Sequence, residues 1–189
     1  PQRSDVLCVF AGLRPLAAPK NDAGEAKTRE ISRSHKLIVS KAGLITITGG
    51  KWTTYRKMAE DTVNMAIKTN KLPFRKCHTR TLRIHGYLEN NQAEGWLSVY
   101  GSDQERILNL YVEDPVFKRL LHPGFDFTVG QVVWAVRHEM ARTVDDVLSR
   151  RIRALILDAR ASLEMAPLVA SVMAAELKRD KAWEENQVR

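Results

Sequence analysis

Gly49-Gly50-Lys51-Trp52-Thr53-Thr54-Tyr55-Arg56 is the stretch that decides how this chain is organised. Before it, residues 36–39 and 44–48 are short β-rich runs separated by Lys41-Ala42-Gly43, which predicts two strands joined by a hairpin turn. After it, apolar residues recur with the period of a helix, which we expect to continue for about five turns. The predicted apolar face consists of Tyr55, Met58, Ala59, Thr62, Val63 and Ala66. The Gly-Gly pair therefore marks a turn from strand to helix.

A helix that starts after two glycines offers a site for an anion. Its first N–H groups have no partner within the helix, and its dipole places positive charge there. Gly49 and Gly50 carry no Cβ that would keep a ligand from the backbone, and Lys51, Thr53 and Thr54 add a charge and two hydroxyls. The spacing matches neither a Walker A loop nor G-x-G-x-x-G. The alternative, which short motifs of this kind leave open, is a tight turn capped by a threonine with no ligand.

Two arginines upstream are further candidates for binding an anion. Arg14 follows the apolar run Val6–Phe10, which we expect to be a buried strand, and Pro15 stiffens the chain after it. Arg33 lies in Ser32-Arg33-Ser34-His35. The planar guanidinium suits bidentate recognition of phosphate. Taken singly, each arginine is better explained as a solvated surface charge.

The second half of the chain has helical patterning. Ser102-Asp103-Gln104-Glu105 resembles a capping box, and Thr128 can cap the helix that follows it. Thr143-Val144-Asp145-Asp146 predicts another helix start, and Pro167 is expected to begin the last helix, through Leu177. The polar residues Glu139, Arg142, Asp145, Asp146, Arg150 and Arg151 are expected to form helical ion pairs. We therefore expect residues 89–189 to form a small all-α domain.

The charge is divided unevenly along the 189 residues, whose net charge is +8. The excess of basic residues lies in residues 1–86, and residues 71–88 are expected to be a basic connector with some strand character at residues 81–84. This distribution suits an anionic ligand, a nucleic acid or an acidic surface as partner of the first part, although the connector lacks the aromatic platform of nucleic-acid binders. No apolar run is long enough to span a bilayer. Cys8 and Cys77 show no metal-binding spacing, so we expect reduced thiols, no metal site and a cytoplasmic location.

These segments together resemble one family. Residues 10–16, 32–35 and 43–60, in that order, are similar to the FAD-dependent glycerol-3-phosphate dehydrogenases and oxidases, and GGKWTTYRKMAED is the most specific part. Ala141 to Arg151 resembles the helical C-terminal domain of that family. The resemblance implies an α+β chain. Residues 1–70 would be strands and one long helix from the end of an FAD-binding, Rossmann-like domain, and the small all-α domain would follow.

The resemblance also implies a reaction and a site. The family oxidises sn-glycerol 3-phosphate to dihydroxyacetone phosphate with hydride transfer to flavin, and passes electrons to quinone or to oxygen. The implied substrate-binding residues are Arg14, Arg33, Lys51 and Thr53. The implied cofactor-binding residues are Gly49, Gly50, Lys51, Trp52 and Thr53. No catalytic residue is implied within this chain.

One departure limits these expectations, since the family's G-x-G-x-x-G nucleotide fingerprint does not occur here. We therefore expect a C-terminal portion that is inactive and does not retain FAD by itself. Peripheral membrane contact, on the cytoplasmic face, and a homo-oligomer are left open, and no nucleic acid is expected. The alternative is a non-catalytic helical module that docks on a protein or membrane surface.

Overall fold

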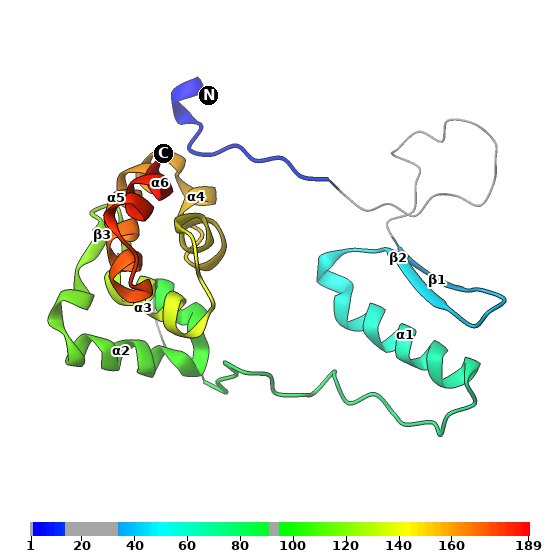
Figure 1. Ribbon diagram of the computed structural model, residues 1–189. Helices are drawn as coiled ribbons and strands as arrows, with labels where there is room; N and C mark the ends of the chain where they lie inside the picture. Colours follow the sequence, from blue (N-terminus) through cyan, green and yellow to red (C-terminus); the bar gives the residue numbers. More distant parts are fainter. Residues whose placement is uncertain (1, 14–33, 91–94) are drawn as a thin grey trace. The chain divides into compact units, whose positions relative to one another are not determined.

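The computed structural model describes residues 2–13, 34–90 and 95–189 (Figure 1). The chain divides into two compact units, one formed by Pro1–Ala11 with Ile84–Arg189 and the other by Gly12–Arg83. We call the first the helical unit and the second the hairpin–helix unit. The described part of the chain is mostly helical and contains two small two-stranded sheets.

The hairpin of the hairpin–helix unit forms as the sequence predicts. Strands β1 (His35–Val39) and β2 (Ile45–Gly49) pair antiparallel, with His35 opposite Gly49 and Val39 opposite Ile45. The turn is closed by a hydrogen bond from the Ser40 N–H to the Leu44 carbonyl at 2.9 Å. Gly43 has a φ of 82°, which glycine adopts without steric strain. Among the described residues of this unit the sheet has two strands, so the Rossmann-like fold expected for residues 1–70 is not established.

The helix after the Gly-Gly turn also forms, but its partly buried face differs from the predicted apolar face. A short 3-10 helix η2 (Trp52–Thr54) leads into α1 (Tyr55–Thr69), a helix of 15 residues. Of the predicted apolar face, Met58, Thr62 and Ala66 are partly buried, whereas Tyr55, Ala59 and Val63 are exposed. Within its unit α1 contacts β2, and a two-stranded hairpin is too narrow to cover a wide helix face.

Two predicted extended segments are not strands. Val6–Phe10 has no strand assignment, and Val9 and Phe10 are exposed. The connector over residues 72–90 contains no helix or strand, so the strand character of residues 81–84 is also wrong. A strand needs a neighbour for its N–H and C=O groups. The described residues supply Val6–Phe10 with only one such bond outside its own turn, from the Ala159 N–H to the Leu7 carbonyl at 3.0 Å.

The helical unit combines short helices and a second two-stranded sheet with longer α-helices. The elements before the second sheet are η1 (Arg3–Asp5), η3 (Gly95–Asp103), α2 (Gln104–Glu113) and η4 (Pro115–Lys118). The second sheet pairs β3 (Leu120–His122) antiparallel with β4 (Phe125–Thr128). The remaining elements are α3 (Val129–His138), the π-helix η5 (Asp146–Arg151), α4 (Ala154–Leu157), α5 (Ala159–Leu177) and α6 (Lys181–Val188). The expectation of an all-α domain over residues 89–189 is therefore wrong in this detail, because a two-stranded sheet is present.

The core of the helical unit is built around α3 and α5, which contact each other (Figure 1). All residues of α3 from Val129 to Val136 are buried. On α5 the buried residues include Met165, Val169 and Met173. Thr128 caps α3 as predicted, with its hydroxyl accepting the Gln131 N–H at 3.4 Å and Gln131 Oε1 accepting the Thr128 N–H at 2.9 Å.

One predicted helix start and one predicted helix cap are wrong. Pro167 lies inside α5, which begins at Ala159 after Asp158, whose carboxylate accepts the N–H groups of Arg160 and Ala161. Proline normally interrupts a helix because it lacks an N–H and its ring crowds the preceding turn. Here buried side chains on both sides of Pro167 hold α5 against the core. The second error concerns the capping box predicted at the start of α2. The residue before α2 is Asp103, and its side chain makes no capping hydrogen bond.

Candidate functional site

The Gly-Gly turn adopts a conformation that its own packing requires. Gly49 and Gly50 have φ values of 74° and 89°, in the left-handed region that favours glycine. A Cβ on Gly50 would lie 2.6 Å from Met58 Sδ and 3.2 Å from His35 Cβ. The turn thus brings β2, the first turns of α1 and the start of β1 close together around one glycine.

Of the polar residues after the turn, Thr54 closes the turn, whereas the side chains of Lys51 and Thr53 are free to contact a ligand. The Thr54 hydroxyl donates to the Lys51 carbonyl at 2.9 Å and accepts the Lys51 N–H at 3.4 Å. Thr54 is therefore the capping threonine, and its hydroxyl is occupied within the turn. Lys51 and Thr53 have exposed side chains. Since the amides of Trp52 and Thr53 open a helix, they have no acceptor within it, and with Lys51 they form a positive, donor-rich face.

An aromatic pair lies beside this face. The rings of Trp52 and Tyr55 stack with their centroids 5.7 Å apart at an angle of 30°. Trp52 is 87% exposed and Tyr55 is 59% exposed, although aromatic side chains of this size are usually well buried. Backbone amides next to a flat apolar surface fit one face of a planar, partly anionic ring such as a flavin. Among the described residues, Trp52 and Tyr55 offer such a ring one exposed face.

An ion-pair chain holds the turn in place from behind. His35 Nε2 lies 3.0 Å from Asp61 Oδ2, and Lys57 Nζ donates to Asp61 Oδ1 at 2.7 Å. The hydrogen bond from Lys57, followed by that from His35, holds the pKa of the Asp61 carboxyl below its usual value. His35 is thereby fixed opposite Gly49 and beside Gly50. The sequence by itself gives His35 no role, because its partner Asp61 is 26 residues away along the chain.

Arg56 joins α1 to the basic connector. Its Nη1 donates to Glu60 Oε2 at 2.8 Å and to Thr79 Oγ1 at 3.1 Å. The Arg56 hydrogen bond is also the main cause that lowers the pKa of the Glu60 carboxyl. Arg56 is therefore a structural residue in this unit, although it belongs to the same sequence stretch as Lys51.

The predicted site residues fall into two groups, one within the described part of the chain and one outside it. Gly49, Gly50, Lys51, Trp52 and Thr53 lie together around one turn, as contiguous residues must. Arg14 and Arg33 lie outside the described residues, so their positions relative to this turn stay predictions.

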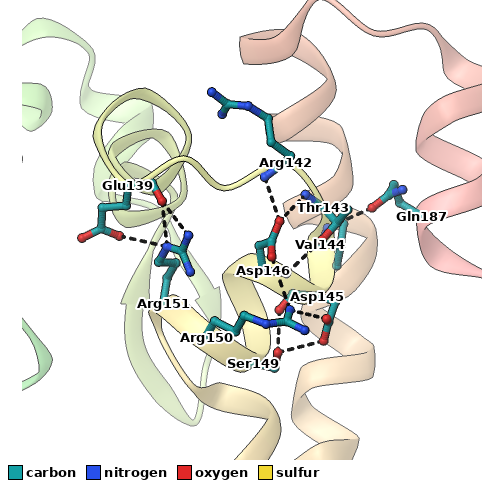
Figure 2. A network of polar contacts seen from close by, with 10 residues as sticks. All are labelled: Glu139, Arg142, Thr143, Val144, Asp145, Asp146, Ser149, Arg150, Arg151 and Gln187. Atoms are coloured by element: carbon teal, nitrogen blue, oxygen red, sulfur yellow. Dashed lines mark hydrogen bonds and ion pairs between the residues drawn. The ribbon is translucent and has the colours of Figure 1, made fainter. Parts of the chain in front are cut away.

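The predicted ion pairs of the helical unit are largely present (Figure 2). Arg150 pairs with Asp145 and Asp146, and Arg151 Nε lies 3.9 Å from Glu139 Oε2. The Asp146 carboxylate accepts the N–H groups of Arg142 and Thr143 at 3.0 Å each, which lowers its pKa.

Arg142 departs from this prediction. Its guanidinium donates to the carbonyls of Val136 and Ala141, at 3.1 and 2.8 Å. The network closes the loop between α3 and η5, and it is tied to α6 by the Val144 N–H, which donates to Gln187 Oε1 at 2.9 Å.

The geometry defines a class: a helical domain joined to a strand–Gly-Gly–helix segment with cationic and aromatic side chains on its surface. Residues 41–184 match the family described as the C-terminal domain of alpha-glycerophosphate oxidase. This match covers more than half of the chain, and the chain therefore belongs to that family.

Individual relatives extend the similarity to nearly the whole chain. It is 32% identical to the mitochondrial glycerol-3-phosphate dehydrogenase of Arabidopsis thaliana, over 100% of this chain and 34% of that protein. It is 33% identical to the human mitochondrial enzyme, over 99% of this chain and 28% of that protein. The Schizosaccharomyces pombe enzyme is 34% identical, over 95% of this chain and 35% of that protein. The chain thus spans about a third of the length of the curated relatives it matches.

The names of the relatives bear on where the protein is located. The relatives are named as mitochondrial proteins, so the cytoplasmic location expected from the sequence is wrong. Among the described residues, no helix is both long enough and apolar enough to cross a membrane.

Proposed function

We propose that this chain forms one wall of the active site of an FAD-dependent glycerol-3-phosphate dehydrogenase. The reaction is the oxidation of sn-glycerol 3-phosphate to dihydroxyacetone phosphate. The observation that carries the proposal is the Gly49–Tyr55 surface, where a lysine, exposed amides and an uncovered aromatic pair meet at one helix start. Relatives named glycerol-3-phosphate dehydrogenases, similar over almost the whole chain, support the same activity.

The residues of the turn have two roles in this proposal. The backbone at Gly49, Gly50, Lys51 and Trp52 would hold one face of the flavin ring, where N–H groups would stabilise negative charge on the reduced ring. Flavin, when bound, supplies the hydride acceptor for the substrate's alcohol carbon. Lys51 and Thr53 line the face shared by substrate and cofactor. Trp52, stacked on Tyr55, presents a flat apolar surface that excludes water from one side of the ring.

The phosphate of the substrate requires more positive charge than Lys51 alone provides. Arg14 is proposed to bind the phosphate, with Arg33 supporting the same anion site, since guanidinium groups bind phosphate oxygens in pairs. The position of Arg33 two residues before His35 is consistent with this role, because His35 itself lies beside Gly50.

The organisation of the whole protein is part of the proposal. Residues 1–70 belong to the FAD and substrate domain, residues 71–88 are a connector, and residues 89–189 form the C-terminal domain. The 189 residues contain no G-x-G-x-x-G sequence, so these residues by themselves are expected to bind FAD weakly and to lack activity. A mitochondrial location is proposed from the relatives' names, with quinone or oxygen as electron acceptor and with peripheral membrane contact.

The test is steady-state kinetics and flavin content of the full-length protein that contains these residues. Arg14→Ala is expected to lower kcat/KM for glycerol 3-phosphate by about 100-fold, because a charge-assisted bond to phosphate is lost. Lys51→Ala is expected to lower it by about 10-fold or more and to weaken flavin retention. Lys41→Ala, which alters an exposed lysine in the hairpin turn, serves as the matched control.

The outcomes separate the proposal from its alternative. Unchanged kcat/KM in Arg14→Ala would remove Arg14 from the phosphate site. A full-length protein without bound flavin would contradict the enzyme proposal and leave the non-catalytic interaction module as the explanation.

A further inference from the structure

A pocket of about 320 Å³ opens within the helical unit. Residues of η3, β4, the end of α3 and the segment around η5 line it. Its apolar wall contains Trp96 and Phe127, whose ring centroids lie 5.0 Å apart. Its lining also includes three arginines, Arg150, Arg151 and Arg153. We call this cavity the arginine pocket, and no residue of the hairpin–helix unit contributes to it.

The backbone that carries the three arginines is irregular at two successive points. Arg150 and Arg151 end the π-helix η5, a rare form that is frequent at functional sites. Arg153 has a φ of 61°, in the left-handed region, where a residue with a Cβ is strained. Ala154, which follows, is fully buried and anchors the chain. These irregularities let three arginines within four residues line the same cavity.

The three arginines differ in how they are held, and Figure 2 shows the contacts of Arg150 and Arg151. Arg150 is paired with Asp145 and Asp146. Arg151 donates from Nε and Nη2 to the Glu139 carbonyl, at 3.0 and 2.6 Å. Among the residues that the structure describes, none supplies a hydrogen-bond or ion-pair partner to the guanidinium of Arg153. Two guanidinium groups are thus fixed at the pocket, and a third has its charge uncompensated.

The inner end of the pocket offers a neutral donor. Gln131 is 1% exposed and its Oε1 is occupied by the Thr128 N–H. Gln131 Nε2 lies 3.4 Å from the Tyr100 hydroxyl, which accepts this bond and keeps its own proton for another acceptor. Burial raises the pKa of Tyr100 to about 12, so the hydroxyl stays protonated at neutral pH. Glu139 is the one carboxylate of the lining, and it is directed at Arg151.

We propose that the arginine pocket binds a phosphate monoester whose organic part is a flat ring. The guanidinium groups and the Tyr100 hydroxyl would bind the phosphate, and the Trp96 and Phe127 wall would contact the ring. A volume of about 320 Å³ is at the lower end of ligand pockets, enough for a mononucleotide-sized ligand and too small for a dinucleotide. The inference stands apart from the proposed function, because it uses other residues.

The experiment is a calorimetric titration of the full chain with AMP and with phenyl phosphate. Adenosine and inorganic phosphate, titrated separately, provide the two halves of the ligand. Saturable binding of both esters is expected, with a dissociation constant on the order of 0.1 mM. Each half alone is expected to bind at least about 10-fold more weakly, because it contacts only one side of the pocket.

Two variants assign the binding to the pocket. Arg153→Gly removes the guanidinium and relieves the left-handed backbone, so binding is expected to fall by about 10-fold while the melting temperature is kept or raised. Trp96→Ala is expected to weaken AMP binding more than inorganic phosphate binding. Arg179→Ala, at an exposed arginine after α5, is the matched control and is expected to change neither.

Three results would overturn the proposal. The first is the absence of heat from either ester up to millimolar concentration. The second is ester binding that Arg153→Gly leaves unchanged. The third is equal affinity for AMP and inorganic phosphate, which would make the pocket a simple anion site without recognition of the ring.

Discussion

The two units differ in where their specificity and their stability reside. The described residues of the hairpin–helix unit include none that is fully buried, yet this unit carries the most distinctive sequence stretch. The helical unit has a continuous core of buried residues from α2 to α5. A surface such as Trp52 and Tyr55 is left uncovered where it is meant to contact something else, whereas a core is determined by the chain's own packing. The proposed flavin-facing surface and the buried core therefore lie in different units of this chain.

The largest expected effect is a difference in hydrogen exchange between the units. Amides of α3 and α5 are expected to exchange about 1000-fold more slowly than those of α1 and the β1–β2 hairpin, because buried contacts control local opening. Exchange measured by mass spectrometry on the full chain would test this. Equal protection of α1 and α5 would contradict the contrast, and fast exchange across residues 89–189 would contradict the proposed domain.

Two leucines of α2, one buried and one exposed, test whether α2 packs into the core as described. Leu110 is 5% exposed and Leu108 is 44% exposed. Leu110→Ala is expected to lower the free energy of unfolding by about 3 kcal/mol, through lost burial and a cavity, and Leu108→Ala by less than about 1 kcal/mol. Urea unfolding followed by the fluorescence of buried Trp134 would measure both. Similar losses in the two variants would show that α2 is not packed as described.

One glycine from each unit allows the cost of adding a side chain to be compared between the two units. A Cβ on Gly101 would lie 1.8 Å from the Gly86 carbonyl oxygen, which is backbone, whereas a Cβ on Gly50 would meet the flexible end of Met58 at 2.6 Å. Gly101→Ala is expected to cost about 3 kcal/mol and Gly50→Ala about 1 kcal/mol, since only the side chain can move aside cheaply. Circular dichroism melts would rank the two variants. A larger loss for Gly50→Ala would mean that the turn is more rigid than its surroundings suggest.

Local sequence signals predicted the elements that depend on near neighbours. The hairpin around Lys41-Ala42-Gly43, the helix from Tyr55 and the Thr128 cap are all confirmed. Each is stabilised by contacts within a few residues, so its pattern is visible in one stretch of sequence. The pairs of Arg150 with Asp145 and Asp146 were predictable for the same reason.

Errors arose where distant contacts decide the outcome. Val6–Phe10 has the composition of a buried strand, but a strand forms only when another strand pairs with it. Pro167 has the sequence signature of a helix start, yet it lies within α5 because buried neighbours on both sides outweigh the lost hydrogen bond. The left-handed Arg153 and the bond from Arg151 to the Glu139 carbonyl carry no sequence signal at all.

The sequence by itself determined the family, the Gly-Gly turn and the periodic helices, because these depend on residue identity and on spacing along the chain. The tertiary structure decided which helix faces are buried, that His35 meets Asp61, and that three arginines gather around one pocket. The physical reason is the same in each case. Burial, ion pairing and pocket shape depend on residues that are distant in sequence, and only the folded chain brings them together.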